Sequence, residues 1–302
     1  MRRFFRILFL LLLVLLIGVG LLLVSHGFLY PSDSHTAADS LTILTFNTHS
    51  MGQARKTPDN NVIRFLRQTD ADILCLQEVD VYKSDRHLTL SELKSALDRY
   101  PYTYFDFKVY NSRHQFGNAV FSKYPLINKH TIRYPSRANI SSCCDVLFGR
   151  DTIRLFTNHL ESYRFTESEL DSVVAHPFQA DTVIRRKAMS ASRSRFRQAR
   201  IVADSVDASP YPVILVGDLN STPVSPAYLL LRCRLRDAFL RCSSLRLGST
   251  FRKGRFGIRI DYILHSEVLH PTDCRTVSTT ASDHLPLSAA FILDKSHPSL
   301  SD

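Results

Sequence analysis

The sequence predicts a mixed α/β domain of layered sheets and helices behind an apolar N-terminal segment. Short runs rich in β-branched and aromatic residues alternate in part with stretches of helical periodicity, and adjacent strand-like runs without a helix between them occur mid-chain. This partial alternation disfavours a doubly wound parallel sheet. Of the 302 residues, 44% are hydrophobic and 22% are charged, which excludes a disordered or fibrous chain.

Residues 1–30 have the pattern of a cytoplasmic tip followed by a transmembrane anchor. Three arginines, ending at Arg6, precede an uninterrupted apolar run at residues 7–24. A helix of this length spans about 27 Å, close to the hydrocarbon thickness of a bilayer. The positive-inside rule then predicts a cytoplasmic N-terminus and an extracytoplasmic domain after a polar linker at residues 31–40. A signal peptide cleaved near Ala38 is the alternative.

Residues 41–302 are predicted to form one catalytic-size domain, because they show no internal linker or repeat. Several short runs in this segment are predicted strands, since each is β-branched or aromatic and bounded by polar or turn residues. They lie at residues 41–46, 73–76, 119–121, 153–156, 213–216, 260–264 and 287–292.

Helical spacing appears between these runs. Residues 60–68 and 90–97 are predicted helices, and Thr89 is a residue type that caps the second one. Another amphipathic face is expected from Phe196, Ala199, Val202, Ala203 and Val206. A turn leading into a short helix is expected at residues 220–228.

The cysteines give no framework. Six cysteines in 302 residues are too few for a disulfide scaffold, and no metal-binding CxxC spacing occurs. Cys75 lies in an apolar run and is predicted to be a core residue. An oxidising compartment would allow one disulfide among Cys233, Cys242 and Cys274, and the sequence does not assign the pair.

Polar side chains lie at the ends of most predicted strands. They are Asn47, Gln77, Glu78, Asn158, His159, Asp218, Asn220, Asp261, Asp283 and His284. A charged group beside a buried strand is costly unless it is paired or bound to a metal. One such residue is common, and several taken singly have ordinary explanations as turn or cap residues. Their repetition predicts one shared polar site, whose oxygen-rich side chains suit Mg²⁺, or Mn²⁺ in its place.

These segments resemble the endonuclease/exonuclease/phosphatase superfamily, which includes deoxyribonuclease I, apurinic endonucleases and sphingomyelinases. The matching segments stand in the family's order and cover residues 41–293. They are Thr45-Phe46-Asn47, Leu76-Gln77-Glu78-Val79, the stretch from Gly117 to Leu126, Thr157-Asn158-His159-Leu160, Gly217-Asp218-Leu219-Asn220-Ser221, Arg259-Ile260-Asp261-Tyr262 and Ser282-Asp283-His284. The resemblance implies a four-layered α/β sandwich of two packed sheets flanked by helices, with the active site at one edge.

The resemblance also implies roles for individual residues. Glu78 would be the main Mg²⁺ ligand, with Asn47 and Asp283 nearby. Asp218 would orient or deprotonate the attacking water, and Asn220 would hold a phosphate oxygen.

The remaining roles fall on the histidines and asparagines. His284, oriented by Asp261, would contact the scissile phosphate. His159 would contact another phosphate oxygen or protonate the leaving group, and it disfavours the apurinic endonuclease branch. Substrate contacts are expected from Asn47, Asn118 and Asn158, and the identity of the general base stays open.

A basic segment at residues 185–200 carries much of the net charge of +10. It holds seven positive charges and no acidic residue, and Arg193, Arg197 and Arg200 share one helical face. Arg195 falls on the apolar side of that helix. Either the helix starts later in the sequence, or the Arg195 side chain extends along the apolar surface so that its guanidinium group reaches water. The segment is either a patch for nucleic-acid backbone or anionic lipid headgroups, or a solvated helix face.

Together these features favour a membrane-anchored, Mg²⁺-dependent phosphodiesterase that faces the extracytoplasmic space and acts like a nuclease. A phosphoesterase acting on lipid headgroups or on small molecules such as inositol phosphates is the first alternative. The second is a non-catalytic binding module on the same fold. The complete polar set argues against that module, because a degenerate site is expected to lose some of these residues.

Overall fold

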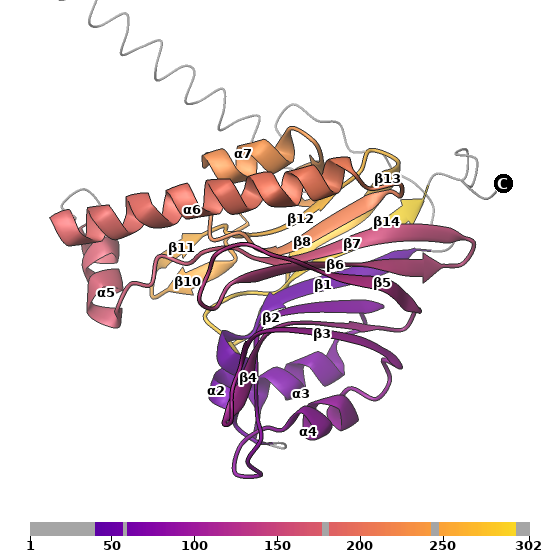
Figure 1. Ribbon diagram of the computed structural model, residues 1–302, viewed down its shortest axis with the longest axis horizontal. Coiled ribbons are helices and arrows are strands. Elements are labelled where there is room, and N and C mark those ends of the chain that lie inside the picture. The colour runs from indigo at the N-terminus through magenta and orange to yellow at the C-terminus, as the bar shows by residue number, and fades with distance from the viewer. Residues whose placement is uncertain (1–39, 57–58, 177–180, 243–247, 294–302) are drawn as a thin grey trace, which may run out of the picture.

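Two six-stranded sheets pack face to face, and helices cover both outer faces, giving four layers (Figure 1). The computed structural model describes residues 40–56, 59–176, 181–242 and 248–293. The predicted anchor at residues 7–24 lies outside them. Within the described residues, no helix has both the length and the apolar character needed to cross a membrane. The observed layers confirm the mixed α/β sandwich.

The first sheet has the strand order β13-β14-β1-β2-β4-β3. Its strands are β1 (Leu41–Asn47), β2 (Ile73–Tyr82), β3 (Tyr102–Tyr110), β4 (His114–Ser122), β13 (Leu269–Thr276) and β14 (Leu287–Leu293). Strands β1 and β2 are parallel, and their connection carries α2 (His49–Ala54) and α3 (Asn61–Gln68). Helix α3 and α4 (Leu90–Ala96) form the outer layer on this side (Figure 1).

The second sheet repeats this plan with the order β5-β6-β7-β8-β12-β9. Its strands are β5 (Leu126–Ile132), β6 (Ile140–Phe148), β7 (Asp151–His159), β8 (Val213–Asp218), β9 (Arg236–Asp237) and β12 (Asp261–His265). Strands β7 and β8 are parallel and are joined through α5 (Glu167–Ala175) and α6 (Thr182–Asp207). The remaining elements are α7 (Pro226–Arg232), α8 (Ala238–Cys242) and the hairpin of β10 (Phe251–Lys253) and β11 (Phe256–Ile258).

The main core lies between the sheets and is built from alternate residues of their inner strands. Cys75 on β2 and Leu155 on β7 belong to this cluster and are fully buried, as expected for Cys75. All six cysteines are free thiols in the structure. The helices bury their own apolar faces against the outer sides of the sheets.

All the predicted strands are present, and the two predicted helices α3 and α4 begin where expected. Thr89 caps α4 with a full capping box, its hydroxyl accepting from the Glu92 amide. The prediction for α6 was wrong in two respects. The helix begins at Thr182, and Phe196 lies on its exposed side, whereas Arg195 is buried with only 2% of its surface exposed.

His265, at the end of β12, gives the fold a pH dependence. Burial lowers the pKa of this imidazole from 6.5 to about 4. The folded state therefore keeps His265 neutral where the unfolded chain binds a proton. The contribution of the neutral His265 to the free energy of unfolding is complete above pH 6.5. The free energy of unfolding then falls by about 3 kcal/mol as the pH drops from 6.5 toward 4.

We expect His265→Gln to flatten this part of the stability profile. Urea unfolding of both proteins between pH 4.5 and 7.5 should give a difference in unfolding free energy that shrinks toward low pH. The exposed residue His176, changed to Gln, serves as the control. A difference that is constant with pH would contradict the prediction.

Candidate active site

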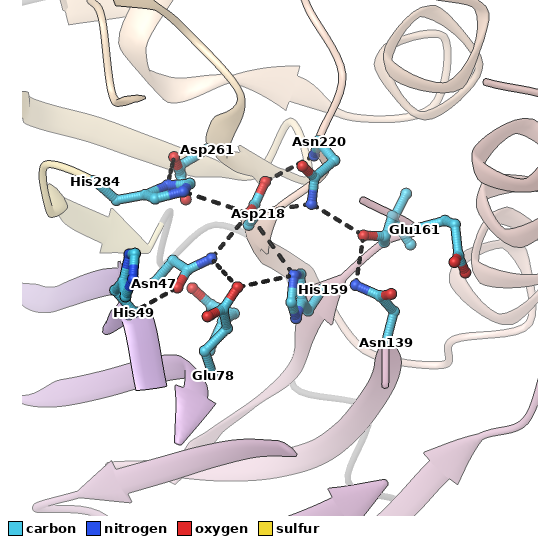
Figure 2. Close-up of polar contacts among 12 residues, drawn as sticks. Asn47, His49, Glu78, Asn139, His159, Glu161, Asp218, Asn220, Asp261 and His284 are labelled. Atoms are coloured by element: carbon cyan, nitrogen blue, oxygen red, sulfur yellow. Dashed lines mark hydrogen bonds and ion pairs between the residues drawn. The ribbon is translucent and has the colours of Figure 1, made fainter. Parts of the chain in front are cut away.

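The carboxyl ends of the parallel strands of both sheets meet at one edge of the sandwich (Figure 2). Asn47 ends β1 and His159 ends β7, where it pairs in register with Asp218 at the end of β8. The Asn47 amide nitrogen donates to Asp218 Oδ2 at 3.0 Å and so links the two sheets. Because parallel strands end on the same side, residues far apart in the sequence converge here.

Glu78 reaches this edge through a β-bulge in β2. The pairing with β4 shifts register between Leu76 and Val79, and Glu78 itself has a left-handed φ of 55°. A bulge re-aims one side chain out of the regular alternation. Glu78 Oε1 accepts a hydrogen bond from Asn47 Nδ2 at 3.1 Å, while the neighbouring Gln77 is buried against Thr45.

Backbone strain is concentrated around the site. Residues 49–54 of α2 all have positive φ values, between 46° and 62°, and Asn220 has a φ of 48°. Each non-glycine residue in this region costs about 1–2 kcal/mol. Such conformations persist where the surrounding structure enforces them, and they cluster at functional sites.

Gly217, next to Asp218, allows β7 and β8 to approach closely. It has a φ of 127°, and an added Cβ would lie 2.0 Å from the main-chain oxygen of Asn158. We expect Gly217→Ala to lower the unfolding free energy by roughly 2–6 kcal/mol, because a strained φ and an overpacked contact each cost about 1–3 kcal/mol. Urea unfolding monitored by circular dichroism measures this loss.

Gly254→Ala is the matched control for this substitution. Gly254 also has a left-handed φ, of 58°, but a Cβ there meets nothing within 4 Å. It should therefore cost only about 1 kcal/mol of backbone strain. Equal losses in the two variants would show that contact with Asn158 is not the cause.

Asp218 lies at the centre of the site and is fully buried. Its carboxylate accepts from the Asn220 main-chain N–H at 2.7 Å and from the side chains of Asn47 and Asn220. Burial, and then repulsion from Asp261, raise the pKa of Asp218 to about 6. The group can therefore exchange a proton close to neutral pH.

Asp261 and His284 form a buried ion pair beside it. His284 Nδ1 lies 2.9 Å from Asp261 Oδ2, and His284 Nε2 lies 3.9 Å from Asp218 Oδ2. Burial opposes the charge of the imidazole, but the two carboxylates outweigh it and raise the pKa of His284 to about 10. His284 is thus a cation at neutral pH whose second nitrogen points toward Asp218.

His159 completes the central group. Its Nε2 atom is buried and has no hydrogen-bond partner among the described residues. It lies 3.7 Å from Glu78 Oε1 and 3.9 Å from Asp218 Oδ2. A buried donor without a partner at the meeting point of two carboxylates marks a place where a further group would bind.

The donor atoms suit a hard divalent cation. Asp218, Asp261 and His284 offer atoms within 4.8 Å of one another, but a protonated His284 cannot act as a ligand. Glu78 is different, because 27% of its side chain is exposed, and its carboxylate stands beside the Asn47 amide. Carboxylate oxygens match the preferences of Mg²⁺ and Mn²⁺, whereas Asn47 turns its nitrogen toward Glu78 and its oxygen toward the His49 main-chain N–H.

Asp283 is paired with a residue that the sequence did not identify. His49 Nδ1 lies 2.7 Å from Asp283 Oδ1. This hydrogen bond raises the pKa of His49. At Asp283, burial favours a higher pKa, but the hydrogen bond from His49 together with the charges of His284 and His49 lowers the pKa below its ordinary value. Of the three predicted metal ligands Glu78, Asn47 and Asp283, the first two are in contact with each other, and Asp283 is hydrogen-bonded to His49 through Oδ1.

Three predicted asparagines bind main-chain carbonyls. Asn118 Nδ2 donates to Ile140 and Thr157, and Asn158 Nδ2 donates to Val216; both side chains are buried. A substrate contact through either Nδ2 would require these bonds to be given up, whereas both Oδ1 atoms are buried without a partner among the described residues. Asn220 Nδ2 donates both to Asp218 Oδ2 and to the Leu160 carbonyl (Figure 2).

Sequence reasoning missed the support of the loop after His159. Gln198 on α6 accepts from the Glu161 amide and donates to its carboxylate, and Arg195 donates to the Glu161 carbonyl. Asn139 binds the Leu160 carbonyl from the other side. The misplaced charge of Arg195 was the available signal. A buried arginine must find acceptors, and here it finds them beside the site.

Comparison with known proteins identifies the family of this chain. The model of the Endonuclease/Exonuclease/phosphatase family matches residues 44–284. Protein angel homolog 2 of Danio rerio is 30% identical over 189 residues, which are 59% of this chain and 30% of that protein. The human protein of the same name is 26% identical, over 57% of this chain and 30% of its own length. The chain thus spans about a third of the length of these curated relatives.

Solved structures share the fold at low identity. An endonuclease/exonuclease/phosphatase from Beutenbergia cavernae has a TM-score of 0.62 at 20% identity, covering 85% of this chain and 72% of that one. Sphingomyelinase C from Streptomyces griseocarneus has a TM-score of 0.56 at 19% identity, with coverages of 84% and 99%. TDP2 of D. rerio, complexed with a single-strand DNA product, has a TM-score of 0.58 at 15% identity, with coverages of 84% and 100%. Since the family model covers most of the chain, this protein belongs to the Endonuclease/Exonuclease/phosphatase family.

Proposed function

We propose that this protein is a divalent-metal-dependent phosphodiester hydrolase whose substrate is a nucleic acid. The observation that carries the proposal is the convergence of Glu78, His159, Asp218 and the Asp261–His284 pair at one strand edge. Family membership supports hydrolysis of phosphoesters, since the family's name covers nucleases and phosphatases. The single-strand DNA product held by TDP2 on this fold supports a polynucleotide.

The metal would be held mainly by the Glu78 carboxylate, with Asn47 beside it. When bound, it would neutralise phosphate charge and act as a Lewis acid on a phosphoryl oxygen. Asp218 orients the attacking water and accepts its proton, for which a pKa of about 6 is well matched. Asn47 and Asn220 fix the Asp218 carboxylate by hydrogen bonds to Oδ2.

The two histidines serve the phosphate. Asp261 holds His284 as a cation, so that its Nε2–H donates to a phosphoryl oxygen on which negative charge develops. His159 Nε2 serves a second phosphate oxygen or the leaving oxygen. These donors are fixed before substrate arrives, which reduces the reorganisation needed in the transition state.

A phosphoesterase for lipid headgroups or inositol phosphates is the second candidate. The apolar run at residues 7–24 favours it, because an anchor there would keep the domain at a bilayer. The likeness to sphingomyelinase C is a likeness of fold at 19% identity and is compatible with either substrate class.

A substrate panel separates these candidates. The full chain, in detergent, is incubated with single- and double-stranded DNA, RNA, sphingomyelin and inositol phosphates, with Mg²⁺, Mn²⁺ or EDTA. We expect cleavage of a polynucleotide that EDTA abolishes. Cleavage of the lipid or the inositol phosphates alone would favour the second candidate. If no substrate is hydrolysed and no metal binds, the enzyme proposal is wrong and the protein is a non-catalytic binding module on this fold.

We also propose that residues 7–24 anchor the protein, with the N-terminus in the cytoplasm and the catalytic domain outside. The three arginines before the run support this orientation. Externally added protease should then degrade the domain in intact cells, and carbonate extraction should leave the chain in the membrane fraction. A soluble chain in the carbonate supernatant would refute the anchor.

A further inference from the structure

The outward side of α6 carries a row of arginines interleaved with apolar side chains. Helix α6 forms the outer layer over the second sheet (Figure 1) and buries its opposite side, including Ile184, Ala191 and Val202. Residues spaced three or four apart share a helical face. The α6 ridge consists of Arg186, Met189, Arg193, Phe196, Arg197 and Arg200, which are all exposed.

The arginines of this ridge are not neutralised. In the described part of the chain, none of Arg186, Arg193, Arg197 and Arg200 forms an ion pair. The neighbouring Lys187, by contrast, binds the Glu169 carboxylate on α5 through both oxygens. Four of the seven positive charges of the basic segment are therefore displayed on one face, which extends for about 21 Å along the helix.

Apolar side chains lie among these charges rather than behind them. Met189 is 57% exposed and Phe196 is 38% exposed, and each lies between arginines of the ridge. Leu229 of the adjacent α7 is 36% exposed. A single exposed apolar residue is ordinary, but two of them beside four arginines on one helix have the composition of a membrane-surface helix.

We propose that the α6 ridge docks on the surface of an anionic lipid bilayer. Its arginines would pair with headgroup phosphates, and Met189 and Phe196 would enter the boundary between headgroups and acyl chains. A nucleic-acid backbone would satisfy the arginines equally well. It would leave both apolar side chains without a partner, and so the lipid surface accounts for more of the ridge.

The predicted anchor is compatible with this contact where the leaflet that faces the domain, the outer one in the proposed orientation, carries anionic lipid. Residues 25–40 separate the apolar run from β1, and an extended segment of that length reaches at most about 55 Å. A domain tethered in this way stays at the bilayer, where a weak surface contact suffices to orient it. The docking argument itself rests on the ridge and does not require catalysis.

A tryptophan reporter tests which face touches the bilayer. The chain contains no tryptophan, so Phe196→Trp in the full chain introduces a single fluorophore into the ridge. Tyr110→Trp places one at a 68% exposed position at the end of β3 in the other sheet. Each variant is added to brominated phosphatidylcholine vesicles, with or without about one third phosphatidylserine. We expect strong quenching and a blue shift for Phe196→Trp in the anionic vesicles, and neither for Tyr110→Trp.

Charge reversal supplies the matched control. In the Phe196→Trp protein, Arg193→Glu with Arg197→Glu should raise the vesicle concentration for half-maximal quenching at least tenfold. Arg64→Glu with Arg67→Glu makes the same change in net charge on α3, in the opposite outer layer, and should leave quenching unchanged. Circular dichroism and thermal melting verify that each variant is folded.

Three results would overturn the proposal. They are absence of quenching for Phe196→Trp in anionic vesicles, equal quenching at both tryptophan positions, and indifference to the Arg193 and Arg197 reversals. If instead a single-stranded oligonucleotide, but not the vesicles, alters the fluorescence of Phe196→Trp, the ridge is a nucleic-acid surface and the lipid proposal is wrong. Because quenching needs no turnover, these outcomes are independent of whether the substrate panel succeeds.

Discussion

Replacing Asp218 by Asn is expected to lower the turnover number on the best substrate by about 10²–10⁴-fold. Asparagine keeps the shape of the side chain but cannot accept a proton from water. It also removes the negative charge that faces His284 Nε2 at 3.9 Å. Initial rates at saturating substrate and metal measure the effect.

A stability measurement separates this loss from misfolding. Burial and the proximity of Asp261 make the ionised form of Asp218 costly, which is why its pKa is raised to about 6. Without metal at pH 7, removing this charge is favourable, but the Asn variant also loses one acceptor, since both oxygens of Asp218 accept hydrogen bonds. The two effects oppose each other, and the variant should melt within about 5 °C of the wild type. The exposed residue Asp85, changed to Asn, is the control and should change neither activity nor melting. Full activity of Asp218→Asn would refute the assignment of this residue.

Replacing Glu78 by Gln is expected to weaken divalent-metal binding by more than about 100-fold. Loss of a residue that only hydrogen-bonds to a metal ligand costs about 10–100-fold, and Glu78 would be a ligand itself. The substitution removes the carboxylate charge while keeping its position in the β2 bulge. Activity at limiting Mg²⁺ should fall in parallel and recover in part at high Mg²⁺ or Mn²⁺. Isothermal titration calorimetry and metal titrations of activity measure the two effects.

Glu267→Gln is the matched control for this change. Glu267 is 78% exposed and pairs only with Arg236 on the surface, so losing its charge should leave metal affinity unaltered. Wild-type metal affinity in Glu78→Gln would transfer the ligand role to another residue. The buried carboxylates Asp218 and Asp261 are the other acidic candidates for that role.

The central strands were predictable because their signal is local. The runs predicted for β1, β2 and β8 are largely apolar, as is typical of strands buried on both faces. The run for β7 is apolar except for Arg154. The polar residue ending each run was visible for the same reason, since a sudden charge after a buried strand is conspicuous. Those ends supplied Asn47, Glu78, His159 and Asp218.

The edges of both sheets, and the inner strand β6, escaped prediction. Strands β13 and β3 border one sheet and β5 and β9 border the other, and none of the four was foreseen. An edge strand has one free side and carries polar residues, as in β5, where four of seven residues are exposed. β13 also contains Pro271 at a register shift, which weakens its strand signal further.

The helix that supports the site was misread for a related reason. Phe196 was assigned to the buried face because it is aromatic, and Arg195 was treated as an anomaly because it is charged. In the structure their places are exchanged: Arg195 is buried because the Glu161 carbonyl and the Tyr163 ring stabilise it. Both partners belong to the loop after β7, so the sequence periodicity of residues 182–207 carries no information about them.

Residue types and local periodicity were sufficient to establish the mixed α/β class, the central strands and the chemical nature of the site. Its geometry depends on contacts between distant segments: the bulge that turns Glu78, the His49–Asp283 pair, and the burial that sets the pKa values of Asp218 and His284. Ionisation and side-chain direction respond to whatever lies within a few ångströms in space. Those neighbours come from strands more than a hundred residues apart, such as Asn47 and Asp218, and are fixed only when the two sheets pack together.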